Sequence, residues 1–183
     1  MITLEISIQN IVASTSLGIE LDLNDLALKL NGAEYEPEAF PGLIFRLKNP
    51  KSAILIFRSG KLVCTGAKTL EQVGNAVSRT VDSIRQAGVP IAEKPEFVVQ
   101  NIVASADLGH EINLNAIAVS LGLDRVEYEP EQFPGLVYRM DSPKVVVLLF
   151  GSGKMVCTGA KKEADAQLAV ENIKKELISS GML

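Results

Sequence analysis

The sequence is short of the residues that most catalytic and metal-binding sites need. Its 183 residues include no tryptophan, one histidine (His110) and two cysteines, and aromatic residues make up only 5%. Cys64 and Cys157 are remote from each other and from the histidine in the sequence, which argues against a disulfide framework or a zinc site. Catalytic-triad, phosphate-loop and metal-ligand motifs are also missing. We therefore expect a protein that is not an enzyme and uses no metal or cofactor.

Long apolar runs are lacking as well. No run approaches the roughly 18 residues that cross a bilayer, and the first ten residues contain an acid and no base, unlike a secretory signal. We expect no membrane partner, no targeting signal and a cytoplasmic location. With 47% hydrophobic and 22% charged residues, the composition is that of an ordinary globular protein.

What the sequence does contain is an internal duplication. Three segments occur twice, in the same order and nearly unchanged. They are QNIVAS at 9–14 and 100–105, YEPExFPGL at 35–43 and 128–136, and SGKxVCTGAK at 59–68 and 152–161. Two copies are fewer than a solenoid needs, so we predict two repeats, 1–91 and 92–183, in one pseudo-twofold body.

Each copy predicts the element order β-α-β-β-β-β-α, an α+β fold. In the first copy the elements are a strand at about 3–14, a short helix at 24–30, strands at 33–36, 43–48, 52–57 and 61–66, and a long helix at 69–87. The long helix has a capping box, Thr69 with Gln72, and Asn24 and Asn115 are candidate N-caps of the short helices. Its apolar stripe has helical spacing and comprises Leu70, Val73, Val77, Val81 and Ile84.

The strands AILIF at 53–57 and VVLLF at 146–150 are apolar on both faces, a pattern typical of strands covered on both sides. Two long helices cannot cover both faces of about ten strands. If they cover one face, the other is an apolar surface of the kind that marks a binding site. The alternative is a sandwich in which two sheets cover each other.

Charge is unevenly distributed, although the net charge is only −4. The segment 39–68 holds six basic residues and no acid, and 132–162 holds five basic residues and one acid. Both segments cover the last three strands of a copy. The duplicated concentration of positive charge favours a polyanionic partner, although basic residues at strand ends also protect sheet edges.

At the paired QNIVAS, YEPExFPGL and SGKxVCTGAK segments the sequence resembles the TATA-box-binding protein family over nearly its whole length, and the closeness of the two halves resembles its archaeal branch. The resemblance implies a saddle: two tandem repeats forming one curved antiparallel sheet of about ten strands, with helices on the convex face. It also implies a general transcription factor that binds the minor groove of TA-rich promoter DNA and nucleates preinitiation complex assembly.

Strand alternation divides the residues of the last two strands between the faces. Leu55, Phe57, Val63 and Thr65 share the DNA side, whereas Ile54, Ile56, Leu62 and Cys64 face the helices. The minor groove offers mainly hydrogen-bond acceptors, and the family resemblance implies that Asn10, Thr65, Asn101 and Thr158 donate to them. The residues expected to press on the groove floor are Val12, Leu55, Val63, Val103, Leu148 and Val156.

Four of the six phenylalanines occupy repeat-equivalent positions: Phe40, Phe57, Phe133 and Phe150. In the family such residues are wedges that enter base steps at both ends of the site and kink the duplex. Phosphate contacts are expected from Arg46, Arg58, Ser59, Lys61 and Lys68, and from Arg139, Ser152, Lys154 and Lys161. Arg58 is matched by Gly151, so its contact is expected on one side only.

The resemblance also implies protein partners. The second-half loop with Glu129, Glu131 and Gln132 is expected to contact transcription factor B, and RNA polymerase would follow indirectly. We expect a monomer on DNA and allow for a homodimer of the free protein through its apolar face. The alternative function is a duplicated apolar-ligand-binding module that uses the same sheet face, but basic strand ends suit a polyanion better.

Overall fold

A computed structural model describes residues 4–49 and 51–183. Both halves have the predicted element order. The first half contains β1 (Ser7–Ser16), α1 (Leu23–Lys29), β2 (Ala33–Glu34), β3 (Leu43–Lys48), β4 (Lys51–Ile56), β5 (Lys61–Ala67) and α2 (Leu70–Gln86). The second half contains β6 (Val98–Asp107), α3 (Leu114–Leu121), β7 (Val126–Glu127), β8 (Leu136–Asp141), β9 (Lys144–Leu149), β10 (Lys154–Ala160) and α4 (Glu163–Ser179).

The chain folds into two compact units. The first-half unit is Asn10–Gln100, and the second-half unit combines the described residues before Asn10 with Asn101–Leu183. The change from one unit to the other therefore falls inside β1 and inside β6. Within the second-half unit the Gln9 side-chain amide donates a hydrogen bond to Ser105 Oγ at 2.9 Å, which ties the first residues of β1 to β6.

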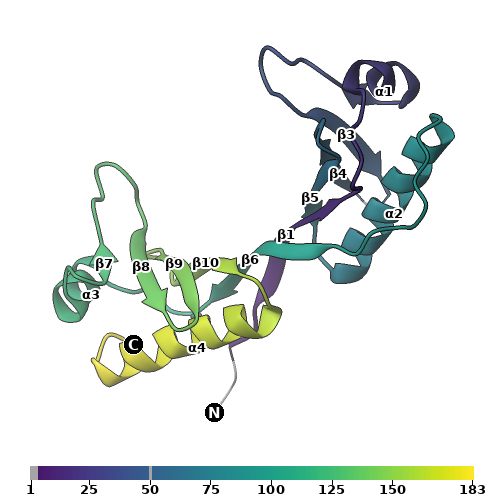
Figure 1. Cartoon of the computed structure of the whole chain (residues 1–183). Coiled ribbons are helices and arrows are strands. Elements are labelled where there is room, and N and C mark those ends of the chain that lie inside the picture. The colour runs from purple at the N-terminus through teal and green to yellow at the C-terminus, as the bar shows by residue number, and fades with distance from the viewer. Residues whose placement is uncertain (1–3, 50) are drawn as a thin grey trace. The chain divides into compact units, whose positions relative to one another are not determined.

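The ten strands are antiparallel neighbours in the order β2-β3-β4-β5-β1-β6-β10-β9-β8-β7, so the predicted antiparallel sheet is confirmed. α2 packs on β4 and β5, and α4 packs on β9 and β10. Figure 1 shows each long helix across one face of its own unit's strands, and no helix of the described residues covers the other face. A sandwich within either unit is therefore excluded.

Burial alternates along the strands, as strand geometry requires. The residues of β4 and β5 that face α2 are each at most 1% exposed and comprise Ile54, Ile56, Leu62 and Cys64. The residues between them are half-buried and comprise Leu55, Val63 and Thr65. β9 and β10 repeat the same pattern. The two faces that strand alternation predicts are thus confirmed.

The long helices bury the predicted stripe with one exception. Val73, Val77, Val81 and Ile84 of α2 are at most 4% exposed. Leu70 is 55% exposed, so its place in the stripe was wrong. It is the first residue of α2, and because helical side chains lean toward the N-terminus, it points past the end of the packed region.

The capping box of α2 is present. Gln72 N donates to Thr69 Oγ1 at 3.1 Å, and Gln72 Oε1 accepts from Lys68 N at 2.9 Å. Gln72 thus reaches one residue further back than the usual capping box, and both side chains satisfy backbone donors at the helix start.

The predicted N-caps of the short helices are wrong by two residues. Asp22 caps α1 and Asn113 caps α3, each accepting a hydrogen bond from the backbone N–H three residues later. Asn24 and Asn115 are already inside the first turn because each helix begins one residue earlier, at a buried leucine.

Several strand boundaries also differ from the prediction, those of β1 and β2 by more than one residue. β1 occupies 7–16 rather than 3–14, and residue 3 lies outside the described residues. β2 ends at Glu34 rather than residue 36. β2 ends early because the chain then enters a turn, in which Glu36 O accepts backbone hydrogen bonds from Ala39 and Phe40.

Candidate nucleic-acid interface

A row of side chains crosses the helix-free face of each unit. Its members lie opposite one another on neighbouring strands and are half-buried. The rows are Ile44, Leu55, Val63 and Ser14 in the first-half unit, and Val137, Leu148, Val156 and Ser105 in the second-half unit. Three of four residues in each row are apolar, which makes this face suited to binding a partner.

Val12 and Val103 lie on the same face as these rows. They are half-buried and alternate with Ile11 and Ile102, which are each 3% exposed and belong to the core. All six residues predicted for the groove floor therefore lie on the helix-free face of their own unit. The sequence did not single out Ile44 and Val137, which extend the rows.

The predicted donors of each unit are in direct contact. Asn10 Nδ2 donates to Thr65 Oγ1 at 3.1 Å, and Asn10 Oδ1 accepts from Gly66 N at 2.6 Å. A primary amide has two N–H donors, so within the described residues one N–H of Asn10 is left for an outside acceptor. The second-half unit repeats the arrangement around Asn101, at 3.2 and 2.6 Å.

A β-bulge fixes the orientation of these amides. The register between β1 and β5 shifts between Ile11 and Ala13, and Gly66 has φ +97°. This left-handed conformation disfavours any residue with a Cβ atom. The bulge takes the Gly66 N–H out of the strand ladder and directs it to the Asn10 carbonyl oxygen, so the NH₂ group must face the other way. Gly159, with φ +101°, repeats the bulge.

Each unit also holds an edge-to-face pair of phenylalanines. The ring centroids of Phe40 and Phe57 are 5.9 Å apart with planes at 63°, and those of Phe133 and Phe150 are 5.9 Å apart at 66°. None of the four is buried, and Phe133 is 39% exposed. The rings are therefore accessible, as an inserting wedge would have to be.

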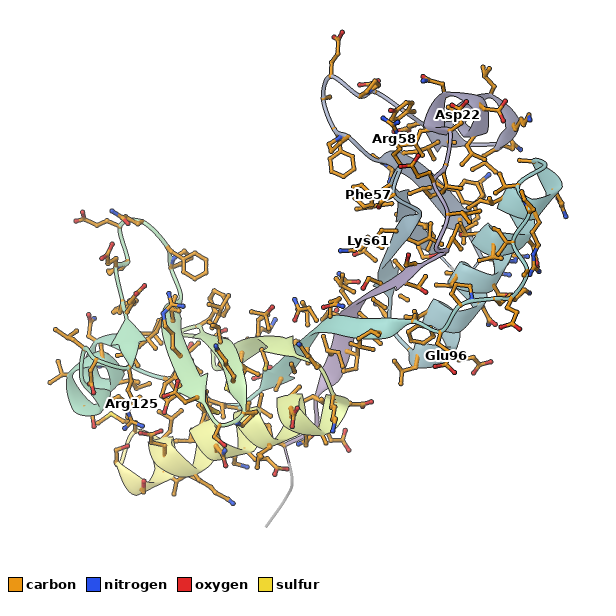
Figure 2. All side chains as sticks on the ribbon, viewed as in Figure 1. Asp22, Phe57, Arg58, Lys61, Glu96 and Arg125 are labelled. Atoms are coloured by element: carbon orange, nitrogen blue, oxygen red, sulfur yellow. The ribbon has the colours of Figure 1, made fainter. Side chains whose placement is uncertain are left out.

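The residues predicted to contact phosphates are exposed in both units. Lys61 lies on the helix-free face because it alternates with Val63 and Thr65. Figure 2 shows Phe57, Arg58 and Lys61 together on the side of the first-half unit away from α2. The sheet thus brings cationic and aromatic side chains to one side.

Arg46 reaches the same face by strand pairing. It lies opposite Ala53, which lies opposite Thr65. Its guanidinium is 3.9 Å from Glu34, with both side chains 61% exposed. Arg139 and Glu127 form the matching pair at 3.6 Å. Exposed pairs of this kind contribute only about 0–1 kcal/mol, so the arginines remain available to a phosphate.

The remaining phosphate candidates lie in the connections. Ser59 and Ser152 are in the turns after β4 and β9, where each hydroxyl accepts a backbone hydrogen bond at 3.4 Å. Lys68 and Lys161 lie between the last strand and the long helix. Lys154 occupies the place of Lys61 in the second-half unit.

The side chains of Glu129, Glu131 and Gln132 are exposed. The turn of their loop is closed by hydrogen bonds from the backbone N–H groups of Gln132 and Phe133 to Glu129 O, at 2.9 and 3.0 Å. The same loop therefore carries the acidic residues and one phenylalanine of the aromatic pair. The first-half loop has the same turn at Glu36, so backbone geometry does not distinguish the two loops.

Four polar residues beside the donors were not predicted from the sequence as part of the site. Gln9 Nε2 donates to Ser105 Oγ, and Gln100 Nε2 donates to Ser14 Oγ, both at 2.9 Å. Each glutamine directly precedes a donor asparagine. The repeated QNIVAS segments could have indicated these residues. A strand that serves only the core does not need the same exposed glutamine in both copies.

Other site types find no support in the described residues. Cys64 and Cys157 are buried, and burial raises the pKa of each thiol to about 11, so neither is a thiolate nucleophile or ligand near neutral pH. No group of three or more metal-ligating side chains occurs among the described residues. Within the same residues, no helix has the length and apolar character to cross a membrane.

The chain is similar to known proteins of one family. The family model described as transcription factor TFIID, or TATA-binding protein, matches residues 5–87 and 96–179. TATA-box-binding protein 2 of Haloferax volcanii is 59% identical over 97% of this chain and 96% of its own length. The TATA-box-binding protein of Thermoplasma volcanium is 58% identical over 98% and 97%.

The solved structure of Methanococcus jannaschii TBP matches with a TM-score of 0.84 and 56% sequence identity, covering 92% of this chain and 95% of that one. The fold is thus that of a class of transcription factors rather than of enzymes. The chain belongs to the TATA-binding protein family, and many of its relatives are archaeal. The predicted family and fold class are confirmed.

Proposed function

We propose that the protein binds the minor groove of TA-rich promoter DNA as a monomer, bends it, and acts as a general transcription factor. The observation that carries this proposal is the asparagine oriented in each unit by a glycine N–H, whose NH₂ group donates to the neighbouring threonine and keeps a second N–H. Two such donors beside rows of apolar side chains suit a ligand with a few acceptors on an otherwise flat surface.

A TA-rich minor groove is such a ligand. It presents adenine N3 and thymine O2 acceptors, whereas a GC pair adds the guanine amino group. Asn10 and Asn101 donate to the acceptors, with Thr65 and Thr158 beside them. Val63 and the other apolar residues of the rows leave no room and no acceptor for a guanine amino group, so GC pairs are disfavoured.

The two phenylalanine pairs supply the bending. Insertion of an aromatic ring between base steps costs a few kcal/mol, and the bent duplex offsets this cost with a larger contact area. TA steps deform easily, so the bend itself contributes to sequence preference. The accessible, paired rings of Phe40 and Phe57 support this role, and Phe133 and Phe150 repeat it.

The exposed cations hold the phosphates on either side of the groove. Arg46, Lys61, Lys68 and their repeat equivalents surround the helix-free face of their own units. Because phosphate contacts release counterions, each contact makes affinity fall with salt. The net charge of −4 works in the opposite direction, so the size of the salt effect reflects both contributions.

The exposed loop of the second-half unit suits a protein partner. We propose that Glu129, Glu131 and Gln132 bind transcription factor B, which brings RNA polymerase to the promoter. The bound protein would be associated with the nucleoid. When no DNA is present, the uncovered apolar rows favour association of two copies. Membership of the TATA-binding protein family leaves the apolar-ligand module without support.

Energy transfer between the ends of a short TA-rich duplex tests the proposal. Binding should change the transfer efficiency, and a GC-rich duplex of equal length should show neither binding nor bending at the same concentration. Phe150→Ala should reduce bending while the melting temperature stays close to that of the native protein. An unbent complex would rule out the wedge role.

Phe45 provides a matched control, because this phenylalanine is only 6% exposed. Phe45→Ala should lower the free energy of unfolding by about 3–5 kcal/mol. If Phe150→Ala destabilises the protein as strongly, the Phe150 ring is a core residue and its effect on DNA is indirect.

A further inference from the structure

The β3–β4 hairpin of the first-half unit ends in two opposed lysines. Lys48, the last residue of β3, pairs directly with Lys51, the first residue of β4. Both side chains are exposed. They lie on the helix-free face, because Lys48 is two residues from Arg46 and Lys51 is two residues from Ala53. Like charges directly opposite each other destabilise a sheet, so a bound anion would relieve a repulsion that is built into this hairpin.

A third cation reaches the same place from the helix side. α2 packs on β4 (Figure 1), and Arg79 of α2 donates a hydrogen bond from Nη1 to the backbone oxygen of Asn49, directly after Lys48. The Arg79 side chain is exposed, and a guanidinium has five N–H donors, so most of them remain for a ligand. The hydrogen bond thus holds Arg79 at the end of the hairpin.

These charges are uncompensated. Among the described residues, no carboxylate forms an ion pair with Lys48, Lys51 or Arg79. Arg46, the next cation along β3, lies 3.9 Å from Glu34. The end of the hairpin therefore concentrates three positive charges with no acid paired to them.

The equivalent hairpin of the second-half unit is not cationic. Asp141 replaces Lys48, and it lies opposite Lys144, the equivalent of Lys51. Asn172 replaces Arg79. One positive and one negative charge thus stand in place of three positive charges. Because the same hairpin forms with an acid opposite a base, the fold itself does not require the lysine pair.

We propose that Lys48, Lys51 and Arg79 form an additional phosphate-binding site for the DNA backbone, present in the first-half unit only. The proposal rests on the promoter binding proposed above and adds a contact on one side of that complex. A phosphodiester suits the cluster because it accepts hydrogen bonds from several directions, and a guanidinium matches phosphate oxygens with two parallel N–H groups.

The position of the cluster favours DNA over an acidic protein segment. Arg46 and Lys48 share one face of β3, so the cluster continues the exposed cations of the helix-free face. A protein partner would also need a large apolar side chain as an anchor. None of the exposed large apolar residues in the described part of the chain lies on β3 or β4.

The consequence is an uneven grip on the duplex. Phosphate contacts do not depend on base sequence, so the first-half unit holds the backbone more tightly than the second-half unit on any site. Neutralising the phosphates beside the first-half unit should therefore cost more affinity than neutralising those beside the second-half unit.

A palindromic TA-rich duplex tests this difference, because its two halves are identical and neither orientation is preferred. Neutral methylphosphonate linkages in one half should make the full-length protein place its second-half unit there, by about fivefold, as expected for the loss of exposed ion pairs. A DNA-cleaving reagent attached to one unit measures this bias. Arg58, which Gly151 replaces in the other unit, contributes to the bias as well, so variants of the cluster decide.

Exchanging the differing residues isolates the cluster. Lys48→Asp gives the first-half hairpin the charges of the second, and should reduce the bias and lower affinity for the unmodified duplex about fivefold. Asp141→Lys should reduce the bias while raising affinity. Arg79→Gln should lower the salt slope by about one. The melting temperature of each variant establishes that it is folded.

Lys175→Asp is the matched control. Lys175 is an exposed lysine of α4, and its substitution changes the net charge as much as Lys48→Asp does. The control should keep the bias and the affinity of the native protein. An equal effect of both substitutions would overturn the proposal, because net charge alone would then explain the result.

Unchanged bias and affinity in Lys48→Asp would also overturn the proposal, and would leave the cluster to an acidic protein partner. If the native protein binds the duplex and no cluster variant alters that binding, this proposal alone fails. If the native protein does not bind the duplex at all, promoter binding fails together with it.

Discussion

Gly42 leaves the space that the ring of Phe40 occupies. A Cβ atom at this glycine would lie 2.7 Å from Phe40 Cε2 and 3.0 Å from Phe57 Cε1. Gly135 stands in the same relation, at 2.7 and 3.0 Å, to the aromatic pair of the second-half unit. The glycine of each FPGL segment therefore sets where both rings of its pair can lie.

The first prediction concerns Gly42→Ala. The added methyl should displace the Phe40 and Phe57 rings without removing them, and should lower affinity for a TA-rich duplex about tenfold, or about 1.4 kcal/mol. Energy transfer across the duplex measures the bend directly. Gly74→Ala is the control, because its Cβ would lie 3.7 Å from Phe97, an ordinary contact. Normal bending by Gly42→Ala would show that ring position is unimportant.

The second prediction concerns base discrimination. Asn10→Ala should reduce the ratio of affinities for AT and GC pairs at the site centre by about tenfold, since a good base contact contributes about 1–3 kcal/mol of discrimination. Asn10→Asp provides a sharper test, because the carboxylate can still accept from Gly66 N but has no N–H to donate. Equal loss of affinity on both sequences would contradict a role in base reading.

The third prediction concerns the orientation of the protein on its DNA site. Arg58→Gly gives the first-half turn the residue found at Gly151, and should remove one phosphate contact and reduce the salt slope by about one. The preference for one orientation on a nearly symmetric site should decrease as well. A DNA-cleaving reagent attached to one unit measures this orientation, because the position of the cuts shows at which end of the site that unit lies. Unchanged slope and orientation would mean that Arg58 does not touch the duplex.

The fourth prediction concerns pH. Burial, together with the hydrogen bond to the Glu176 carboxylate and its charge, raises the pKa of the Tyr138 hydroxyl from 10.0 to about 12, although the nearby Arg125 acts in the opposite direction. Because the folded protein holds the proton more tightly than the unfolded chain, this stabilisation is complete below pH 10 and is lost between about pH 10 and 12.

Tyr138→Phe isolates this effect. Cys64 and Cys157 also retain their protons at high pH, so the native protein and the variant share that contribution. Urea unfolding at several pH values from 9 to 12 should show a smaller loss of stability in the variant. If the free energy of unfolding depends on pH in the same way in both proteins, the Tyr138 hydroxyl has the same pKa in the folded and unfolded states.

Much of the fold followed from local pattern. The duplicated segments, the alternation in β4 and β5, and the stripe and capping box of α2 are each set by residues close in sequence. Prediction failed at boundaries, where Asp22 rather than Asn24 caps α1. Capping depends on which residue first adopts helical geometry, and burial of Leu23 decided this.

The site was predictable as a set of residues but not as an arrangement. The sequence alone determined the duplication, the face of each strand residue and the paired candidates Asn10, Thr65 and Phe57. Only the tertiary structure decided that Gly66 orients the Asn10 amide and that Gly42 spaces the rings. The contacts of Asn10 with Gly66 and of Gly42 with Phe57 join residues that are distant in the chain, and their geometry depends on strand register and a bulge, which local patterns do not encode.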